Sequence, residues 1–360
     1  MNETRRNKLR RLKKTLLAGG LLLAFIACSS EQPLQAETQL STTPAVLTVG
    51  LTYQPDIQFA PFYVADALGW ATEAEHATFQ LRHHGMSESL FGALASGTED
   101  LIVAGGDEMY VARGEGVAVT AIMTLYRNYP VALIVPQGSY PHPELPAAAA
   151  LEAGMSVGIP GPYGENWYYL KAVLANYGLS ETDIEIVHIG YTQQAALLAG
   201  RVAAVVGFVN NDVVRLQRAG MAVTLVDATN AHNDLALIGA SLGASQQLLD
   251  NNSAALQEYV DIIKRAIEYV AADPQRAVDI AAAYVPGLDQ PENRQAALDT
   301  LTATIALYGD LGISANMCNL GAINVHVWQA QASFLTERGL AADTPATAAY
   351  STAFAGVCEG

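Results

Sequence analysis

Short apolar runs alternate along this chain with helical patterns of about ten residues, and this alternation limits the folds available to it. A first set between Leu47 and Gly106 contains the runs LTVGL, TFQLRHH and LIVAGG. A second set begins near Met155 and ends near Asp227, with the runs MSVGIP, IEIVHIG, VAAVVGF and VTLVDA. Strands that alternate with helices indicate βαβ units and mainly parallel sheets. The sequence therefore predicts an α/β fold built from two such sets.

The segments that follow each set suggest how the two are joined. Between them lies PVALIVPQGSYPHPELP, whose prolines and glycine predict a crossing. The chain is expected to return near LALIGASLG, residues 235–243. From Ser253 to Arg338 the periodicity is helical, with one apolar face formed by Leu256, Tyr259, Val260, Ile263 and Ile267. We expect this helical block to pack against the first set.

The N-terminus has the pattern of an export signal. Seven Lys and Arg residues precede an apolar run from Thr15 to Ala27, and Cys28 follows it. Residues 1–27 are predicted to be a signal peptide, Cys28 a lipidated first residue and residues 28–45 a flexible tether. Phe25 departs from the Leu that is usual at such sites, and an uncleaved anchor helix is the alternative. Either interpretation places the domain at the cell membrane, on its extracytoplasmic face.

Charge and cysteine usage narrow the partners. The chain has a net charge of −16, and removing residues 1–27 takes away seven of 19 Lys and Arg but only Glu3 of 35 Asp and Glu, leaving −22. Such a surface repels nucleic acid and favours a neutral or cationic ligand. Cys318 and Cys358 form an even pair in a compartment that permits disulfides, so a bond between them is predicted. Two buried free thiols are the alternative.

Polar and aromatic side chains gather where predicted strands end, which in an open α/β sheet is the edge that binds ligands. After LTVGL come Tyr53, Asp56, Gln58 and Phe59. The loop GPYGEN, residues 161–166, opens a helix with glycines that let the backbone approach a ligand, but it lacks the Lys and hydroxyl of a phosphate loop. A tight turn without a ligand is the alternative there. The edge continues in AGGDEM, IGYTQQ and GFVNND, although Asp107 could serve only as a helix cap.

The adjacent His83 and His84 end the run TFQLRHH. Because neighbouring side chains on a strand point to opposite faces, the two cannot easily bind one metal ion. We expect one to face the cleft and the other to be structural, and we predict no metal site.

Three stretches, residues 49–70, 81–108 and 159–174, resemble in order and spacing the thiamine-precursor-binding and riboflavin-binding branch of solute-binding proteins that feed ABC importers. The likeness covers roughly residues 46–242. It implies the two-lobed type II periplasmic-binding-protein fold, with a ligand cleft between lobe 1 (residues 46–135 and 236–360) and lobe 2 (residues 136–235). It also implies a monomer that delivers its ligand to an ABC permease, with no cofactor.

The ligand expected from this resemblance is riboflavin. Pyrimidine-binding relatives tend to carry a carboxylate in the segment corresponding to GFVNND, where Val209 stands here, and a neutral, amide-rich edge suits a flavin. A thiamine pyrimidine precursor of the formylaminopyrimidine type is the alternative. The predicted ligand-binding residues are Tyr53, Asp56, Gln58, Phe59, His84, Gly106, Asp107, Tyr126, Tyr163, Gly164, Glu165, Asn166, Trp167, Tyr191 and Asn210.

The sequence leaves two other classes of function open. Pyrimidine synthases share the fold, but no cysteine-rich active-site run occurs in the chain, so we expect no enzyme and no catalytic residues. A ligand-sensing partner of a membrane receptor would have the same sequence features.

Overall fold

The computed structural model describes residues 45–85, 88–139, 151, 154–176, 178–226, 236–309 and 319–358. The predicted signal peptide, Cys28, the tether up to residue 44 and Cys318 lie outside these ranges. Within them, every helix is too short or too polar to cross a lipid bilayer.

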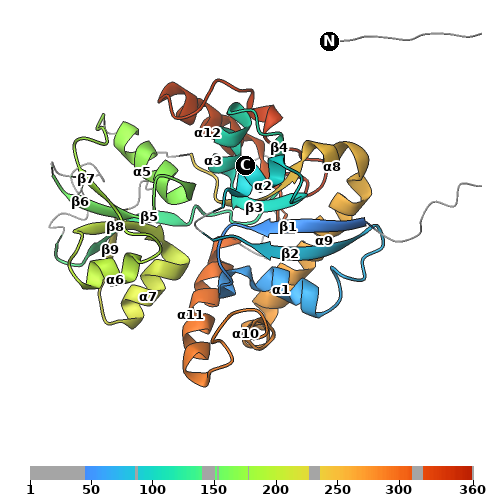
Figure 1. Cartoon of the computed structure of the whole chain (residues 1–360), viewed down its shortest axis with the longest axis horizontal. Helices are drawn as coiled ribbons and strands as arrows, with labels where there is room; N and C mark the ends of the chain where they lie inside the picture. The colour runs from blue at the N-terminus through green and yellow to red at the C-terminus, as the bar shows by residue number, and fades with distance from the viewer. Residues whose placement is uncertain are drawn as a thin grey trace, which may run out of the picture. The chain divides into compact units, whose positions relative to one another are not determined.

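Two five-stranded sheets form the framework of two lobes (Figure 1). The first sheet has the order β2-β1-β3-β10-β4, with strands β1 (Ala45–Leu51), β2 (Ala77–His83), β3 (Leu101–Gly105), β4 (Val119–Thr124) and β10 (Ala240–Ser245). The second has the order β7-β6-β8-β5-β9, with β5 (Val131–Pro136), β6 (Ser156–Ile159), β7 (Glu185–His188), β8 (Ala204–Phe208) and β9 (Val223–Val226).

The pairing within the two sheets follows one plan. Strand β1 pairs in parallel with β2 and β3, and β6 pairs in parallel with β7 and β8. In each sheet the fourth strand of the order runs antiparallel to both of its neighbours: β10 in the first sheet and β5 in the second. The predicted α/β architecture with two sets of strands is therefore present.

The first crossing between the lobes lies earlier than predicted. Strand β5 pairs with β8 and β9, so residues 131–135 belong to the second lobe and not to the first. The chain crosses between Thr124 and Val131, beside Pro130. A fully buried apolar strand has the same sequence pattern in either sheet, which explains the misplaced boundary.

Helices cover both faces of the sheets. In the first lobe these are η1 (Ile57–Phe59), α1 (Ala60–Ala67), α2 (Leu90–Ala95) and α3 (Gly106–Gly114). In the second they are α5 (Gly164–Asn176), α6 (Gln193–Leu198), the π-helical turn η2 (Val209–Val213) and α7 (Val214–Arg218). The C-terminal part adds α8 (Gln246–Asn251), α9 (Ser253–Ala272), α10 (Pro274–Ala281), α11 (Pro291–Leu307), α12 (Val325–Glu337) and η3 (Ala346–Ala348).

The C-terminal helices pack on the first lobe, as the periodicity predicts. Helices α9 and α10 both lie against α1, and the five apolar residues predicted for the inner face of α9 are all buried. One of them, Tyr259, stacks on Phe79 of β2 with ring centroids 4.2 Å apart. Each such buried side chain contributes about 1.5–3 kcal/mol to folding. Helix α11 extends beyond the first lobe and contacts η2 and α7 of the second (Figure 1).

The C-terminal segment is held by a short parallel pair, β11 (Ile323–Asn324) with β12 (Val357–Cys358). Cys358 is disulfide-bonded. Its predicted partner, Cys318, lies outside the described residues, so the pairing stays a prediction.

Candidate functional site

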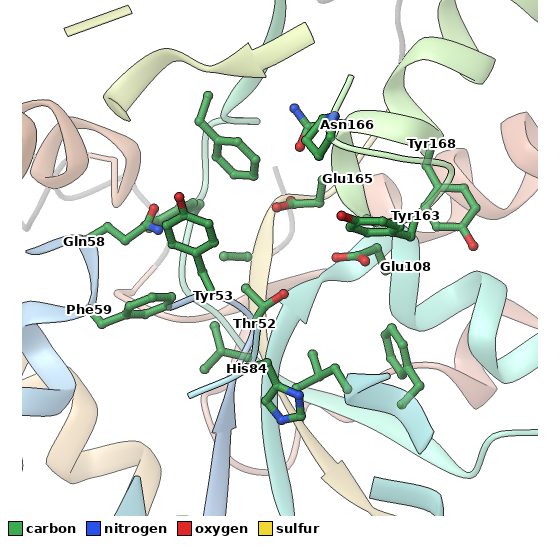
Figure 2. A pocket seen from close by; sticks show the side chains of 18 of the residues that line it. Thr52, Tyr53, Gln58, Phe59, His84, Glu108, Tyr163, Glu165, Asn166 and Tyr168 are labelled. Atoms are coloured by element: carbon green, nitrogen blue, oxygen red, sulfur yellow. The ribbon is translucent and has the colours of Figure 1, made fainter. Parts of the chain in front are cut away.

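A cavity of about 710 Å³ lies between the two lobes. The carboxyl ends of β1, β2 and β3 supply its first wall, and the segments after β6, β7 and β8 supply the opposite one (Figure 2). Parallel strands end at the same edge of a sheet, so side chains far apart in sequence meet there. The polar and aromatic residues on its walls are Thr52, Tyr53, Gln58, Phe59, Phe62, His84, Glu88, Phe91, Glu108, Glu115, Tyr126, Tyr163, Glu165, Asn166, Tyr168, Tyr191, Gln193, Phe208, Asn211, Asp212, Arg215 and Tyr308, with Ser89 among the smaller ones.

Most of the ligand-binding residues predicted from sequence lie on this cavity. The structure brings together Tyr53, Gln58, Phe59, His84, Tyr126, Tyr163, Gly164, Glu165, Asn166 and Tyr191. It does not place Asp56, Gly106, Asp107, Trp167 or Asn210 on the cavity wall.

Two of these five residues are engaged in contacts between the lobes. The Asp56 carboxylate accepts a hydrogen bond from Arg215 Nη2 of α7 at 3.0 Å and caps η1 through the backbone N–H of Gln58. Asn210 is fully buried, and its Nδ2 donates to Thr304 Oγ1 of α11 at 2.9 Å. Asp56 and Asn210 therefore hold the lobes together.

The other three residues lie behind the wall. Gly106 lies against Ile238, because a side-chain carbon added there would come within 2.6 Å of that residue. Asp107 is fully buried against Tyr129, and Trp167 packs beneath Lys171, whose Nζ lies 5.4 Å from the ring centroid.

Aromatic rings from both lobes face the cavity. Tyr53 of the first lobe contacts Tyr191 of the second edge to face, with ring centroids 4.7 Å apart. Figure 2 shows Tyr53 and Tyr163 on opposite sides of the space, with Phe59 below Tyr53. Tyr163 is 40% exposed, so its ring is free to pack on a ligand. Flat apolar faces of this kind suit an aromatic ring system.

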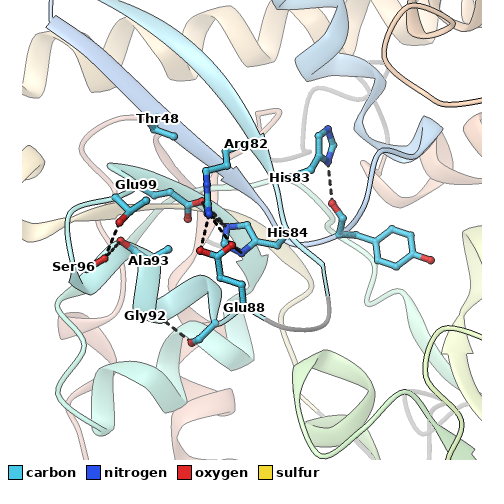
Figure 3. Close-up of polar contacts among 12 residues, drawn as sticks. Thr48, Arg82, His83, His84, Glu88, Gly92, Ala93, Ser96 and Glu99 are labelled. Atoms are coloured by element: carbon cyan, nitrogen blue, oxygen red, sulfur yellow. Dashed lines mark hydrogen bonds and ion pairs between the residues drawn. The ribbon is translucent and has the colours of Figure 1, made fainter.

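His84 lines the cavity and takes part in a charged network with Arg82, Glu88 and Glu99 (Figure 3). The buried Glu99 accepts from His84 Nε2 at 2.5 Å and from Arg82 Nη1 at 2.8 Å, while Arg82 Nη2 also donates to Glu88 at 2.6 Å. These contacts fix the imidazole ring, whose buried Nδ1 lies 3.8 Å from Glu88 Oε2. His83 instead lies 2.9 Å from the Tyr53 carbonyl and 3.1 Å from the Tyr63 hydroxyl, which matches the expectation that one of the pair is structural.

Three carboxyl groups from the two lobes meet at the floor of the cavity: Asp107, Glu108 and Glu165. Glu108 and Glu165 line it, and Asp107 lies behind Gly105. A side-chain carbon added at Gly105 would lie 2.2 Å from Asp107 Oδ1 and 2.6 Å from Glu165 Cγ, so only glycine leaves room for both. The sequence predicts a neutral, amide-rich edge at GFVNND, and the structure adds acidic groups to the same cavity.

Burial keeps these carboxyl groups from ionising freely. Desolvation is the largest cause that raises the pKa of each of the three, and repulsion between the carboxylates raises those of Glu108 and Glu165 further. Glu165 lies in the first turn of α5, where the helix dipole favours a negative charge by up to about 2 kcal/mol. Burying an unpaired charge costs several kcal/mol, so the neutral acid wins. Desolvation also raises the pKa of the partly buried Asp212 to about 6.

Three residues that line the cavity each carry a buried polar atom that makes no hydrogen bond within the described part of the chain: His84 Nδ1, Glu165 Oε1 and Asn211 Oδ1. Buried polar groups are nearly always hydrogen-bonded, and an unmade bond costs about 1–3 kcal/mol. The cavity is therefore bordered by residues whose polar capacity is not fully used, as expected of a site for a ligand with several polar atoms.

Sequence reasoning missed several wall residues, chiefly Glu108, Tyr168 and Arg215. Glu108 follows Asp107 directly. A helix that begins at Gly106 contains both residues, and because successive side chains on a helix point in different directions, this start could have indicated that only one of the two faces the cavity. Tyr168 and Arg215 lie inside helices, away from the strand ends that guided the prediction, and no sequence signal marks them. Among the described residues, no group of three or more His, Cys, Asp and Glu side chains has an arrangement that could hold a metal ion.

Comparisons of the sequence with known proteins find relatives. A family model described as NMT1/THI5 like matches residues 56–277. The chain is 29% identical over 289 residues to the riboflavin-binding protein RibY of Chloroflexus aurantiacus, covering 76% of this chain and 79% of that protein.

Solved structures share the fold. The periplasmic aliphatic sulphonate-binding protein SsuA of Escherichia coli superposes with a TM-score of 0.61 at 16% identity, covering 84% of this chain and 91% of that one. The alkanesulfonate-binding protein SsuA of Xanthomonas axonopodis gives a TM-score of 0.60 at 16% identity, covering 86% and 99%. These likenesses confirm the predicted two-lobed periplasmic-binding-protein fold.

Proposed function

Because the chain belongs to the NMT1/THI5-like family, whose model matches well over half of it, we propose that it is the substrate-binding protein of an ABC importer and that it captures riboflavin. The similarity to a riboflavin-binding protein supports the ligand, and the likeness to periplasmic binding proteins supports the role. The role is binding and delivery, without conversion of the ligand.

The observation that carries this proposal is the cavity itself. Its aromatic walls suit the flat tricyclic ring of a flavin, and the side chains of Gln58, Asn166 and Gln193 suit the hydroxyls of a ribityl chain. Asn166 is positioned for this by a hydrogen bond from its Nδ2 to the Val206 carbonyl at 2.9 Å. A volume of about 710 Å³ is within the range of pockets that enclose vitamin-sized molecules.

Capture follows from the two-lobed plan. A ligand between the lobes adds contacts to both, so it stabilises the closed arrangement over the open one. The ion pair between Asp56 and Arg215 and the contact between Tyr53 and Tyr191 form only when the lobes meet. The permease would then receive the closed, loaded protein.

A thiamine pyrimidine precursor is the second candidate, favoured by the carboxyl groups on the cavity floor. An aminopyrimidine offers an amino donor and a ring nitrogen that pair well with a carboxyl group. A titration of riboflavin into protein lacking residues 1–28 separates the two ligands. Riboflavin binding is expected to quench flavin emission at a 1:1 ratio, and formylaminopyrimidine is expected to compete weakly. Absence of quenching, together with heat released on adding the pyrimidine, would reject riboflavin as the ligand.

Attachment to the membrane is part of the same proposal. Acylation of Cys28 would hold the protein at the outer side of the cytoplasmic membrane, since two or more lipid chains give stable anchoring. Labelling of cells with radioactive palmitate is expected to mark the wild type and not a Cys28→Ala variant, with ligand affinity unchanged. Wild-type protein that takes up no label and retains residues 1–27 would show that these residues remain as an anchor helix.

A further inference from the structure

Glu165 differs from its two carboxyl neighbours in its hydrogen bonds. Asp107 accepts two, from the backbone N–H of Glu108 at 2.8 Å and from the Tyr129 hydroxyl at 2.7 Å. Glu108 accepts one, from the backbone N–H of Gly105 at 3.0 Å. Glu165 is only 5% exposed, and its Oε1 has no partner in the described residues. Accepted hydrogen bonds stabilise the ionised form, so a proton in this cluster is held best on Glu165.

The groups around Glu165 reinforce this assignment. From α3 it is faced by Asp107 and Glu108, and from the crossing segment by the phenols of Tyr126 and Tyr129, which interact with its charge. Strands β5 and β8, which pack against α5, carry only apolar side chains.

Two cations of the second lobe are engaged elsewhere. Lys171 of α5 lies over the Trp167 ring, and Arg215 of α7 is paired with Asp56 of the first lobe. Within the described part of the chain, the charges that act on Glu165 are therefore negative.

Glu165 also points into the binding space. Figure 2 shows its carboxyl group and that of Glu108 directed between Tyr53 and Tyr163. A neutral carboxylic acid offers one O–H donor beside one C=O acceptor. The matching ligand edge carries an acceptor beside a donor, as a carbonyl beside a ring N–H does.

We propose that Glu165 binds as a neutral acid to the edge of the ligand on which a ring N–H lies beside a carbonyl, and so selects cyclic imides and lactams. This inference rests on the proposed function, because the pyrimidinedione ring of riboflavin has such an edge at N3–H. A ligand that presents an anionic oxygen there would lie against the carboxyl groups of Glu108 and Glu165 and would be rejected.

The test compares riboflavin with 3-methylriboflavin, which lacks the N3–H, on the wild type and on Glu165→Gln, Glu165→Ala and the surface control Glu181→Gln. Glutamine keeps a neutral donor and acceptor in the same place. Glu165→Gln should therefore bind riboflavin within about 3-fold of the wild type, whereas Glu165→Ala should bind at least about 10-fold more weakly. Wild type should bind 3-methylriboflavin about 10-fold more weakly than riboflavin, and Glu165→Ala should not distinguish the two. Thermal melting of each variant checks that it folds.

The pH profile gives an independent readout. Wild-type affinity should be lower at high pH than at low pH, because the acid form that binds is lost as pH rises through the raised pKa of Glu165, and Glu165→Gln should show no such fall. Equal binding of both flavins by the wild type, or Glu165→Ala binding as tightly as the wild type, would overturn the inference while leaving riboflavin as the ligand. Absence of binding of either flavin by the wild type at both pH values would reject the proposed function and this inference with it.

Discussion

Tyr163 and Trp167 lie four residues apart at the start of one helix, but only Tyr163 reaches the cavity. Replacing Tyr163 by Ala should weaken riboflavin binding by about 1–3 kcal/mol, because the ligand loses an aromatic face and its buried area. Trp167→Ala removes a ring behind the wall and should leave affinity within about 2-fold, which makes it the matched control. Calorimetric titration of both variants measures the difference. Equal losses in the two would contradict the cavity as the binding site.

Single residues also show where prediction from sequence stops. Strand ends correctly placed Tyr53, Tyr163 and Tyr191 on one cavity, because the pattern of apolar runs fixes which residues follow each strand. It could not separate Asn210, bonded to Thr304, from Asn211 on the wall. That difference depends on α11, more than 90 residues further along the chain.

At the scale of elements, the alternation of strands and helices was sufficient for the architecture but not for the contacts between lobes. Asp56 lies after a strand end and before η1, where a ligand contact is expected. Its hydrogen bond from Arg215 of α7 instead makes it part of the interface between the closed lobes. Nothing in the local sequence of either element shows this pairing. The acidic cluster is similar, since α3 and α5 come from different lobes and meet only when both sheets are assembled.

The link between η1 and α7 predicts a specific effect on closure. Arg215→Ala removes the ion pair with Asp56, which is partly exposed and worth on the order of 0.5–1 kcal/mol. Ligand affinity should fall about 2- to 5-fold, and small-angle X-ray scattering of the ligand-free variant should show a larger radius of gyration. The control is Arg294→Ala, whose partner Asp279 lies in the same helical block. A radius equal to that of the wild type would contradict a role of this pair in closure.

The whole molecule should respond to pH in an unusual direction. Asp107, Glu108, Glu165 and Asp212 all have a pKa raised by burial in the folded state, so between about pH 4.5 and pH 8 the folded protein binds more protons than the unfolded one. Their contribution to stability is present at low pH and is lost as pH rises. A pKa that is one pH unit higher in the folded state corresponds to about 1.4 kcal/mol of stability at low pH, so the four groups together contribute on the order of several kcal/mol.

Urea unfolding of ligand-free protein at about pH 5, 6, 7 and 8 measures this dependence. The free energy of unfolding of the wild type should decrease as the pH increases over the series. That of Glu165→Gln should decrease less, because the variant lacks one of the titrating groups. A free energy of unfolding that rises from pH 5 to pH 8 would show that these carboxyl groups ionise in the folded protein at little cost in free energy.

The crystal structure of the protein grown with riboflavin is the most direct test of the central claim that the cavity between the lobes binds this vitamin. The account predicts flavin density between Tyr53 and Tyr163, with the N3–H edge of the ring within hydrogen-bond distance of Glu165 and the ribityl chain toward Gln58, Asn166 and Gln193. Closed lobes without flavin density, or a flavin bound outside the cavity, would contradict it.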